Sequence, residues 1–340
     1  MTAGRTDASR AATIYDVAKL AGVSISTVSN SLNRPALVKS ETRVRVLAVA
    51  DQLGFVPKVQ ATVLATKGVK RVGVLAPFTS VPSYYRRLTG VLGEAATRGL
   101  DVSVLDLESA ASSVNPVLAS IPARGRVDGL LVMGHSIEVE LEDRLLARGL
   151  STVVLDAESH RLSSVVTDDV AAGRALAAHF AGLGHRRLAF LTQAQTSPYR
   201  STAIKRLEGF QQEAADHGCV VAVAECDGTV EGAAAAVATF LASSDRVTAI
   251  AAHYDQLAVG VLKGARDLGL EVPESVSVAG FDDGPVAEAI GLTTMRLPFE
   301  ESGRIASQVL LDIMGDGTPR RTVVLTCDLI ARSTTGPAAS

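Results

Sequence analysis

The sequence predicts an all-α head of three helices, followed by an α/β body made of two doubly wound parallel-sheet lobes. Three observations predict this division. Between residues 13 and 54 the apolar residues have helical spacing, with capping residues near the helix ends. From Arg71 onward, short apolar runs alternate with longer stretches of helical spacing. The 340 residues, 47% of them hydrophobic, suffice for a large core and for more than one folded unit.

The first two helices of the head are bounded by residues that start and stop helices. Thr13 is expected to cap a helix over residues 14–21, and Gly22 to end it. Ser24 is expected to cap a second helix that reaches about Leu32. A short turn that contains Gly22 therefore joins the two helices.

A third helix completes the head. Pro35 prevents the second helix from continuing, and Ser40 is expected to cap a helix that runs to Leu53. Gly54 stands at the C′ position, where a left-handed conformation favours glycine. The apolar face of this helix is expected to consist of Val44, Val46, Leu47, Ala50 and Leu53.

The body contains apolar runs that are typical of buried strands. They cover residues 72–76, 102–107, 129–133, 152–155, 188–192, 220–224, 249–252, 276–280 and 323–325. Stretches with helical spacing, such as 84–96 and 255–268, separate most of them. Buried strands joined by helical crossovers form parallel sheets that are covered on both faces. Because the runs are too many for one small sheet, two lobes are predicted.

Composition excludes several classes of protein. No apolar run approaches the roughly 20 residues of a membrane span, and residues 1–12 show no secretory signal. Cys219, Cys226 and Cys327 lack metal-type pairing and are typical of reduced thiols. Disordered, membrane and disulfide-rich secreted proteins are therefore excluded, and a cytoplasmic location is expected.

The net charge of −3 conceals an uneven distribution. Residues 1–68 hold nine Lys and Arg against four Asp and Glu, whereas the rest of the chain holds 24 against 32. A basic head on an acidic body indicates a polyanionic partner for the head alone.

The spacing of small residues in the head predicts a helix-turn-helix. Ala18, Gly22 and Val28 supply the small residue at the helix contact, the turn glycine and the apolar residue that packs the second helix onto the first. A short, polar and nearly uncharged face can enter a major groove and bind base edges. On the second helix that face consists of Ile25, Ser26, Thr27, Ser29, Asn30 and Asn33. A plain helical hairpin is the alternative, because Ala, Gly and Val are common residues.

Short motifs occur in order along nearly the whole chain. Those of the head are TIYDVAKLAGVS (13–24), STVS (26–29), LN (32–33), TR (42–43) and LGFVP (53–57). Those of the body are LGHRR (183–187), GFDD (280–283), LTT (292–294) and RST (332–334). Together they resemble the LacI/GalR family of transcriptional regulators. The resemblance implies a DNA-binding head on a periplasmic-binding-protein-like body that binds an effector and forms a homodimer.

The domain boundaries follow from this resemblance and from the apolar runs. They are a disordered tail (1–12), a helix-turn-helix domain (13–57), a hinge helix or linker (58–70), an effector-binding and dimerisation domain (71–334) and a tail (335–340). Within the large domain, the N-lobe is expected at about 71–168 and 298–324, and the C-lobe at about 169–297 and 325–334. The last six residues are small and polar, so they are expected to be mobile.

The resemblance also implies residues that contact DNA. In the family, the hinge becomes helical on the operator, and a leucine from each subunit wedges into the minor groove. The matching residue here is Leu64, for which an ordinary linker residue is the alternative. Lys58 and Thr62 stand where Asn and Arg are common, so this hinge departs from the family pattern. The expected DNA-contacting set is Tyr15, Ser24, Ile25, Ser26, Thr27, Ser29, Asn30, Asn33, Lys58, Ala61 and Leu64.

Polar and aromatic residues follow several predicted strands, where two-lobed α/β proteins bind ligands. Carboxylates that accept hydrogen bonds and rings that cover apolar faces suit a polyhydroxylated or nitrogenous ligand. The residues placed in this way are Ser80, Tyr84, Tyr85, Asp156, Tyr254, Asp255, Phe281 and Asp282. The resemblance adds Arg206, which matches an effector-binding arginine.

Each candidate also has a structural interpretation. Arg206 could be a surface charge on a helix, and Tyr84 and Tyr85 could be core residues. Asp282 and Asp283 could cap the next helix. Tyr254 stands where relatives often have Asn, so the effector cannot be inferred from a sugar-binding relative. The adjacent pair at 168–169 is expected to cap a helix at a lobe crossing rather than to bind ligand.

Catalytic motifs are absent from the sequence, which contains neither a phosphate-binding loop nor a nucleophile elbow. The six histidines have no metal-ligand spacing, so neither a metal nor a cofactor is expected. A kinase or hydrolase is disfavoured for the same reasons. A sugar-binding transport protein is the main alternative, but it should carry a signal peptide and no basic head.

The sequence therefore predicts a DNA-binding regulator, most simply a repressor. Its effector, sugar-like or nucleoside-like, is expected between the lobes, and its operator to be pseudo-palindromic. The short tail has no heptad repeat, which favours a dimer over a tetramer. The identity of the effector, its inducing or co-repressing sense and the operator sequence are left open.

Overall fold

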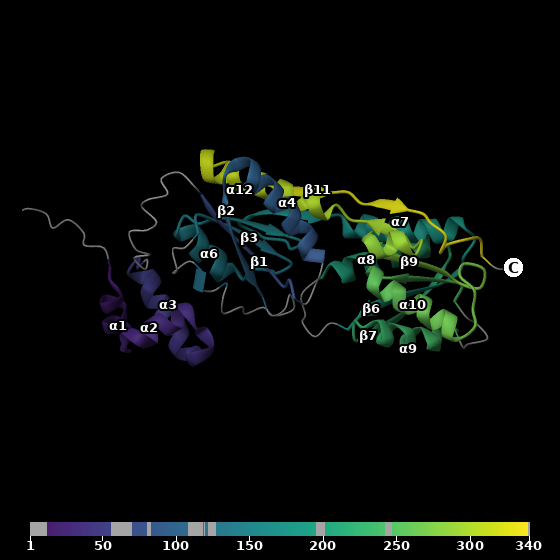
Figure 1. Cartoon of the computed structure of the whole chain (residues 1–340), viewed down its shortest axis with the longest axis horizontal. Helices are drawn as coiled ribbons and strands as arrows, with labels where there is room; N and C mark the ends of the chain where they lie inside the picture. The colour runs from purple at the N-terminus through teal and green to yellow at the C-terminus, as the bar shows by residue number, and fades with distance from the viewer. Residues whose placement is uncertain are drawn as a thin grey trace, which may run out of the picture.

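The computed structural model describes residues 12–55, 70–79, 83–107, 118, 120–121, 127–194, 201–241 and 247–338. Figure 1 shows a helical head and two α/β lobes that follow one another along the longest axis. The hinge prediction, with Lys58, Ala61 and Leu64, lies outside the described residues, as does Ser80.

The head contains α1 (Ile14–Ala21), α2 (Ile25–Asn33), a 3-10 turn (Pro35–Leu37) and α3 (Ser40–Gln52). Thr13 and Asp16 form a reciprocal capping box, in which the Thr13 N–H donates to Asp16 Oδ2 at 2.8 Å. Gly22 ends α1 with a φ of 65°, a left-handed conformation that glycine adopts without strain. The predicted first two helices are confirmed.

Two details of α3 differ from the prediction. Ser40 is the first helical residue, and Lys39 occupies the N-cap position. Val44 is exposed, whereas Val46 and Leu47 are buried. Because residues two positions apart on a helix point about 200° apart, Val44 and Val46 cannot share one face. The core of the head is formed by Val17, Ala18, Ala21, Val28, Leu32, Val46, Leu47, Ala50 and Phe55.

The N-lobe is built on six parallel strands in the order β11-β5-β4-β3-β1-β2. Their bounds are β1 (Arg71–Ala76), β2 (Asp101–Asp106), β3 (Gly129–Met133), β4 (Ser151–Leu155), β5 (Ser163–Thr167) and β11 (Thr322–Leu325). The helices α4 (Ser83–Arg98) and α12 (Phe299–Asp316) belong to the hydrophobic core on one face of this sheet. Helix α6 (Val139–Ala147) belongs to the core on the opposite face. β2 is an edge strand that exposes Val104, and is therefore not the buried strand expected.

The C-lobe repeats this plan with the order β12-β10-β9-β8-β6-β7. Its strands are β6 (Arg187–Gln193), β7 (Val220–Cys226), β8 (Ala249–Ala252), β9 (Ser277–Asp282), β10 (Thr293–Arg296) and β12 (Asp328–Ile330), of which β12 alone is antiparallel. Its helices are α7 (Asp169–Gly182), α8 (Thr202–Asp216), α9 (Val230–Leu241), α10 (Asp255–Asp267) and α11 (Pro285–Ala289). One core lies against α7 and α8, the other against α9 and α10.

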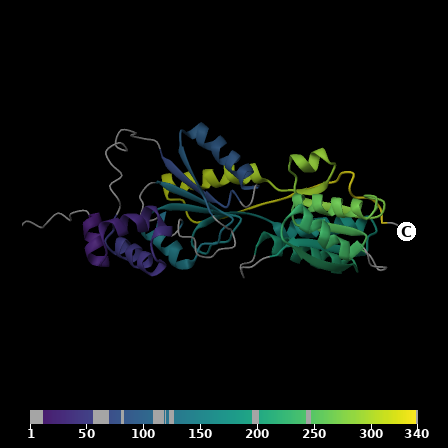
Figure 2. The same cartoon turned by 60° about the horizontal axis from the view of Figure 1, so that its bottom comes forward.

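The chain passes between the lobes three times among the described residues, after β5, after β10 and after β11. In Figure 1 the segment after β11 runs along the upper edge of the molecule from one lobe to the other, and in Figure 2 it crosses between the lobes near the middle of the view. Sequence periodicity missed β5, β10 and β12 because these strands are short and mix hydroxyl-bearing or charged residues with apolar ones. The hydroxyls are bonded: Ser163 Oγ accepts from the Arg321 N–H at 3.1 Å.

The end of the chain differs from the expected mobile tail. Thr335 Oγ1 lies 3.0 Å from His179 Nε2, and the Gly336 N–H donates to Ser277 Oγ at 3.1 Å. The Ala338 N–H donates to the Leu183 carbonyl at 2.9 Å. Residues 335–338 are therefore held on the C-lobe by hydrogen bonds to its buried polar groups.

Candidate DNA-reading head and ligand site between the lobes

The N-terminal end of α2 is an exposed polar surface of the head. Ser24 Oγ accepts the Thr27 N–H at 3.1 Å and lies 2.8 Å from the hydroxyls of Ser26 and Thr27. Ser24, Ile25 and Ser26 are exposed, and Tyr15 on α1 is 67% exposed. Short side chains at the end of an exposed helix can approach base edges closely.

Three other predicted DNA-contacting residues on α2 are less accessible. Thr27, Ser29 and Asn30 are half-buried, and Asn33 is the last residue of α2. Exposed basic residues flank this helix, and they can bind phosphate groups of the DNA backbone. They are Lys19, Arg34, Lys39 and Arg45.

The opposite end of the head is bonded to the N-lobe. Asp51 of α3 pairs with Arg144 Nε at 2.5 Å and with Arg148 Nη2 at 2.9 Å, both on or next to α6. Arg148 also donates to the carbonyl oxygens of Ala50 and Phe55, at 3.0 and 3.1 Å. A cation at the C-terminal end of a helix bonds carbonyls that have no partner within the helix. The head thus docks by α3 while the exposed end of α2 stays free.

In the body, loops at the carboxyl ends of strands from both lobes approach one another. From the N-lobe, Arg86 Nη1 donates to the carbonyl oxygens of Asp282 and Asp283 at 2.9 and 3.2 Å. From the C-lobe, Lys205 Nζ reaches Glu158 at 2.7 Å. These bonds hold together the two edges where most of the predicted ligand residues lie.

Arg206 is buried between the lobes and is not a surface charge. Its Nε donates to Asp169 Oδ1 at 2.8 Å and its Nη1 to the His253 carbonyl at 2.6 Å. Its guanidinium lies 4.8 Å from the centre of the Phe281 ring, which is itself fully buried. Burial alone would lower the pKa of Arg206, but Asp169 and Asp282 outweigh it and raise that pKa.

Asp169 is a residue of this site that sequence reasoning assigned only to capping. Asp168 is the cap of α7 and accepts the Ala171 N–H at 3.0 Å. Asp169 instead points at Arg206, and burial raises its pKa despite that arginine. The pairing joins residues 37 positions apart, so no local sequence signal could reveal it.

Three buried groups beside Arg206 have strongly shifted pKa values. Burial raises the pKa of Asp282 to about 7 and that of Asp255 to about 6. Burial, with Arg206, lowers the pKa of His253 to about 3, so this imidazole is neutral. Clustered shifts of this size are typical of functional sites.

The alternative that Asp282 and Asp283, at the end of β9, cap the next helix is wrong. Gly284 occupies the N-cap of α11, and Asp283 instead pairs with Arg296 and Arg332, each at 2.6 Å. Asp282 has a φ of 117°, a conformation that costs a non-glycine residue free energy. The Asp255 carboxylate accepts from Thr294 Oγ1 at 2.6 Å and from the Gly284 N–H at 3.2 Å, and so fixes this loop.

The aromatic candidates separate into buried and exposed residues. Tyr84 is buried above the end of β3, where a Cβ on Gly134 would lie 1.7 Å from its hydroxyl. Tyr85 is 53% exposed and packs against Phe78, because adjacent helical residues point about 100° apart. Tyr254 donates its hydroxyl to the Gly228 carbonyl at 3.0 Å. Of the pair predicted on α4, only Tyr84 therefore joins the buried group.

Asp156 and Arg87 form a second buried ion pair, with Arg87 Nη2 2.5 Å from Asp156 Oδ2. Arg87 also stacks on the rings of Phe299 and Tyr84, at 4.1 and 5.0 Å from their centres. Sequence reasoning missed Arg87, since an arginine on an amphipathic helix ordinarily faces water. The structure thus brings together Tyr84, Asp156, Arg206, Asp255, Phe281 and Asp282 of the predicted set, and adds Arg87 and Asp169.

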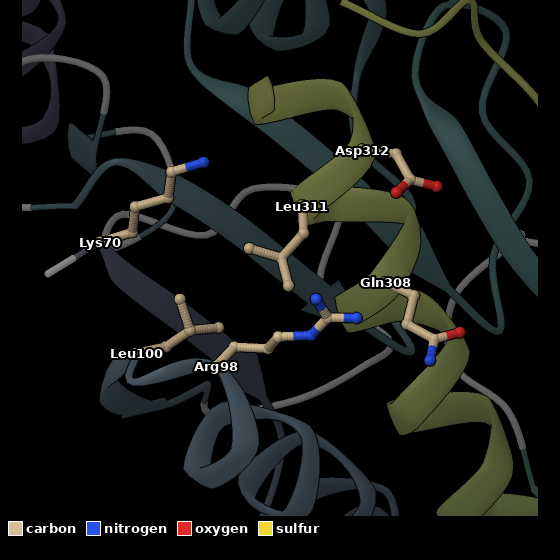
Figure 3. Close-up of a pocket in the computed structure, with 6 residues that line it drawn as sticks. All are labelled: Lys70, Arg98, Leu100, Gln308, Leu311 and Asp312. Carbon is tan, nitrogen blue, oxygen red and sulfur yellow. The ribbon is translucent and has the colours of Figure 1, made fainter. Parts of the chain in front are cut away.

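A separate cavity of about 470 Å³ lies at the far end of the N-lobe (Figure 3). Lys70, Arg98 and Leu100 line one side, and α12 contributes the other residues. Lys70 precedes β1, so this cavity is at the amino ends of the strands. It is distinct from the buried charges between the lobes.

Comparisons with known proteins identify the family. Residues 13–58 match the model of bacterial regulatory proteins of the lacI family, and residues 177–335 match the periplasmic binding protein-like domain. The chain is 31% identical over 321 residues to the HTH-type transcriptional repressor PurR of Photobacterium profundum, covering 92% of this chain and 95% of the relative. The chain belongs to the LacI family of bacterial regulatory proteins.

Two solved structures are similar to this LacI-family chain over both head and body. The lac repressor dimer bound to operator and the anti-inducer ONPF is 25% identical, with a TM-score of 0.70, and the match covers 96% of this chain and 100% of that chain. The CelR–cellobiose complex is 26% identical, with a TM-score of 0.68 and coverages of 95% and 99%. The predicted fold class, a helix-turn-helix head on a two-lobed α/β body, is confirmed.

Membership of this family makes the chain a DNA-binding transcriptional regulator. Its curated relatives are regulators and not enzymes. Within the part of the chain that the structure describes, no helix is both long enough and apolar enough to cross a membrane.

Proposed function

We propose that this chain is a cytoplasmic, dimeric repressor whose affinity for a pseudo-palindromic operator is set by a small molecule bound between its lobes. Two similar structures support the scheme, one a lac repressor dimer on operator and the other a regulator bound to cellobiose. The observation that carries it is the buried group around Arg206, which lies between lobes that a DNA-reading head precedes in the same chain.

The DNA side of the proposal rests on α2. Its exposed N-terminal residues Ser24, Ile25 and Ser26 enter the major groove, and Tyr15 lies beside them. The hinge residues Lys58, Ala61 and Leu64 belong to the proposal from sequence alone. Leu64 is the minor-groove wedge. It contributes to sequence-specific binding of the operator, whereas non-specific, salt-sensitive binding to DNA does not depend on it.

The ligand-binding part of the proposal rests on residues that come from both lobes. A ligand that contacts Arg206 and Asp282 from the C-lobe and Asp156 from the N-lobe binds one arrangement of the lobes better than another. The bonds from Arg86 and Lys205 across the lobes change when that arrangement changes. Effector and operator affinities are then coupled by the same factor in both directions.

The test selects bound duplexes from a random pool with the full chain, then measures operator affinity while small metabolites are added. We expect an enriched pseudo-palindrome, and a metabolite that changes affinity for it. Arg206→Ala should lose the response to the metabolite and keep operator binding. Ile25→Ala should bind the operator more weakly and still bind the metabolite. If no sequence is enriched either in the presence or in the absence of a metabolite extract, the proposal is contradicted.

A further inference from the structure

The two lobes contain the same four-residue pattern, Arg-Leu, any residue, then Gly, at the same place. Helix α4 contains Arg87-Leu-Thr-Gly90, and α8 contains Arg206-Leu-Glu-Gly209. In both lobes the glycine of this sequence packs against a partner helix. A Cβ on Gly90 would lie 1.8 Å from the Glu300 carbonyl oxygen of α12, and one on Gly209 would lie 2.0 Å from that of Val170 on α7.

The partner helices return the contact in the same way. A Cβ on Gly303 of α12 would lie 2.0 Å from the Arg87 carbonyl oxygen. A Cβ on Gly173 of α7 would lie 2.0 Å from the Arg206 carbonyl oxygen. The two helix pairs are therefore packed in one register, and Arg87 in the N-lobe is the counterpart of Arg206 in the C-lobe. The preceding residues, Arg86 and Lys205, correspond too, since each bonds the opposite lobe.

One difference between the lobes leaves Arg87 with unused donors. Asp169, which binds Arg206 Nε, stands one residue before Val170; in the other lobe the residue before Glu300 is Phe299. Arg87 stacks on that ring at 4.1 Å instead of donating to a carboxylate. Among the described residues, Nε and Nη1 of Arg87 accordingly have no hydrogen-bond partner, although only 5% of its side chain is exposed.

Two buried donor nitrogens without acceptors cost free energy, and a bound acceptor relieves that cost. Asp156 Oδ2 likewise has no hydrogen-bond partner among the described residues, because its contact with Arg87 is an ion pair only. The Arg87 charge also acts on Asp282 of the C-lobe, as does that of Arg206. Arg87 therefore belongs to the group between the lobes rather than to a separate structural pair.

We propose that Arg87 binds an oxyanion, a carboxylate or a phosphate, on the small molecule that lies between the lobes. The inference rests on the proposed function and adds the chemical class of the ligand. A guanidinium is the side chain best suited to such a group, because its planar donors match the oxygens of carboxylate and phosphate. The rings of Phe299 and Tyr84 lie against this guanidinium, and its Nε and Nη1 donors have no hydrogen-bond partner in the part of the chain that the structure describes.

The experiment titrates the full chain with sodium phosphate and, separately, with sodium malonate, with sodium chloride adjusted to hold ionic strength constant. Melting temperature and calorimetric affinity are measured. We expect at least one anion to stabilise the wild type beyond chloride, and the responding anion to show whether the group is phosphate or carboxylate. Arg87→Met should bind that anion at least about tenfold more weakly, with Arg87→Lys between the two.

Three controls make the result specific. Arg98→Met, on the same helix but at the outer cavity, should keep the full response. The double variant Arg87→Met/Asp156→Asn removes both charges, so it avoids the buried unpaired carboxylate that Arg87→Met leaves, and asparagine tolerates the φ of 56° at position 156. The far-ultraviolet circular dichroism spectrum without added anion should be the same for the wild type and every variant, and it reports that each one is folded.

The inference is overturned if neither anion stabilises the wild type beyond chloride, or if Arg87→Met and the wild type respond alike. The proposed function fails separately. An anion that binds through Arg87 but leaves operator affinity unchanged would retain the site and contradict its effector role. If a neutral metabolite controls operator affinity and neither anion has an effect, the proposed function is supported and the anion site at Arg87 is contradicted.

Discussion

At the scale of single residues, the carboxyl groups between the lobes depart furthest from their behaviour in water. Asp282 is surrounded by Arg206, Asp255, Arg87 and Arg86, and burial is the largest influence on its pKa. The positive charges offset only part of the cost of burying this carboxylate. Its protonated form is therefore favoured in the folded chain up to a pH near 7, the value to which its pKa is raised.

This shift predicts how stability depends on pH. A carboxyl group whose folded pKa is raised contributes stability below its unfolded pKa of about 4, and that contribution is lost as pH rises toward 7. Because Asn cannot ionise, Asp282→Asn should melt several degrees above the wild type at pH 8 but close to it at pH 4.5. Melting curves at both pH values check this, with the exposed Asp101→Asn as control. A difference between wild type and Asp282→Asn that stays constant with pH would contradict it.

At the scale of elements, close helix crossings fix where the two arginines lie. Glycines at 90 and 303 let α4 and α12 approach until backbone meets backbone, and those at 173 and 209 do the same for α7 and α8. Each crossing places the carbonyl of Arg87 or Arg206 against the facing glycine, and the side chains of the same two arginines form the buried ion pairs with Asp156 and Asp169. Helix packing, rather than helix propensity, therefore positions these functional side chains.

Gly90→Ala should destabilise the chain strongly, whereas Gly93→Ala on the same helix should not. The Gly90 Cβ would overlap the Glu300 carbonyl, which is backbone and cannot move alone. A Cβ on Gly93 meets no described atom within 4 Å, and alanine is the better helix former by about 1 kcal/mol. Denaturant unfolding should show a loss of at least about 2 kcal/mol for the first variant and none for the second. Equal stability of the two variants would disprove the close crossing.

At the scale of the whole molecule, the head is placed by charges that belong to two folding units. Asp51 and the end of α3 meet Arg144 and Arg148 at the end of α6, with side chains that are only partly exposed. Exposed ion pairs contribute little, but several bonds from one guanidinium to a helix end form a stronger contact. The contact leaves the exposed end of α2 accessible for DNA.

Reversing the charge at Asp51 should release the head from the N-lobe. In Asp51→Arg three positive side chains would face one another, so the radius of gyration from small-angle X-ray scattering without DNA should rise. Arg148→Asp combined with Asp51→Arg restores one opposite pair and should bring part of the compaction back. A radius of gyration that is the same for all three proteins would show that this contact does not hold the head in solution.

Features of this protein that depend on neighbouring residues could be predicted from the sequence. Thr13, Gly22 and Ser24 mark helix ends through local hydrogen bonds and backbone freedom, and apolar runs mark nine of the strands, because these signals act over a few residues. The motifs of the head and body were likewise sufficient for the family.

The pairing of the buried charges, in contrast, could not be predicted from the sequence. Asp169 was assigned to capping and Arg87 was overlooked, because their partners lie 37 and 69 positions away in sequence. Tyr84 is buried whereas Tyr85 is 53% exposed, since one position on a helix changes which surface a ring reaches. The order of the strands and the crossing of the helices bring these groups together, and neither leaves a trace in local spacing.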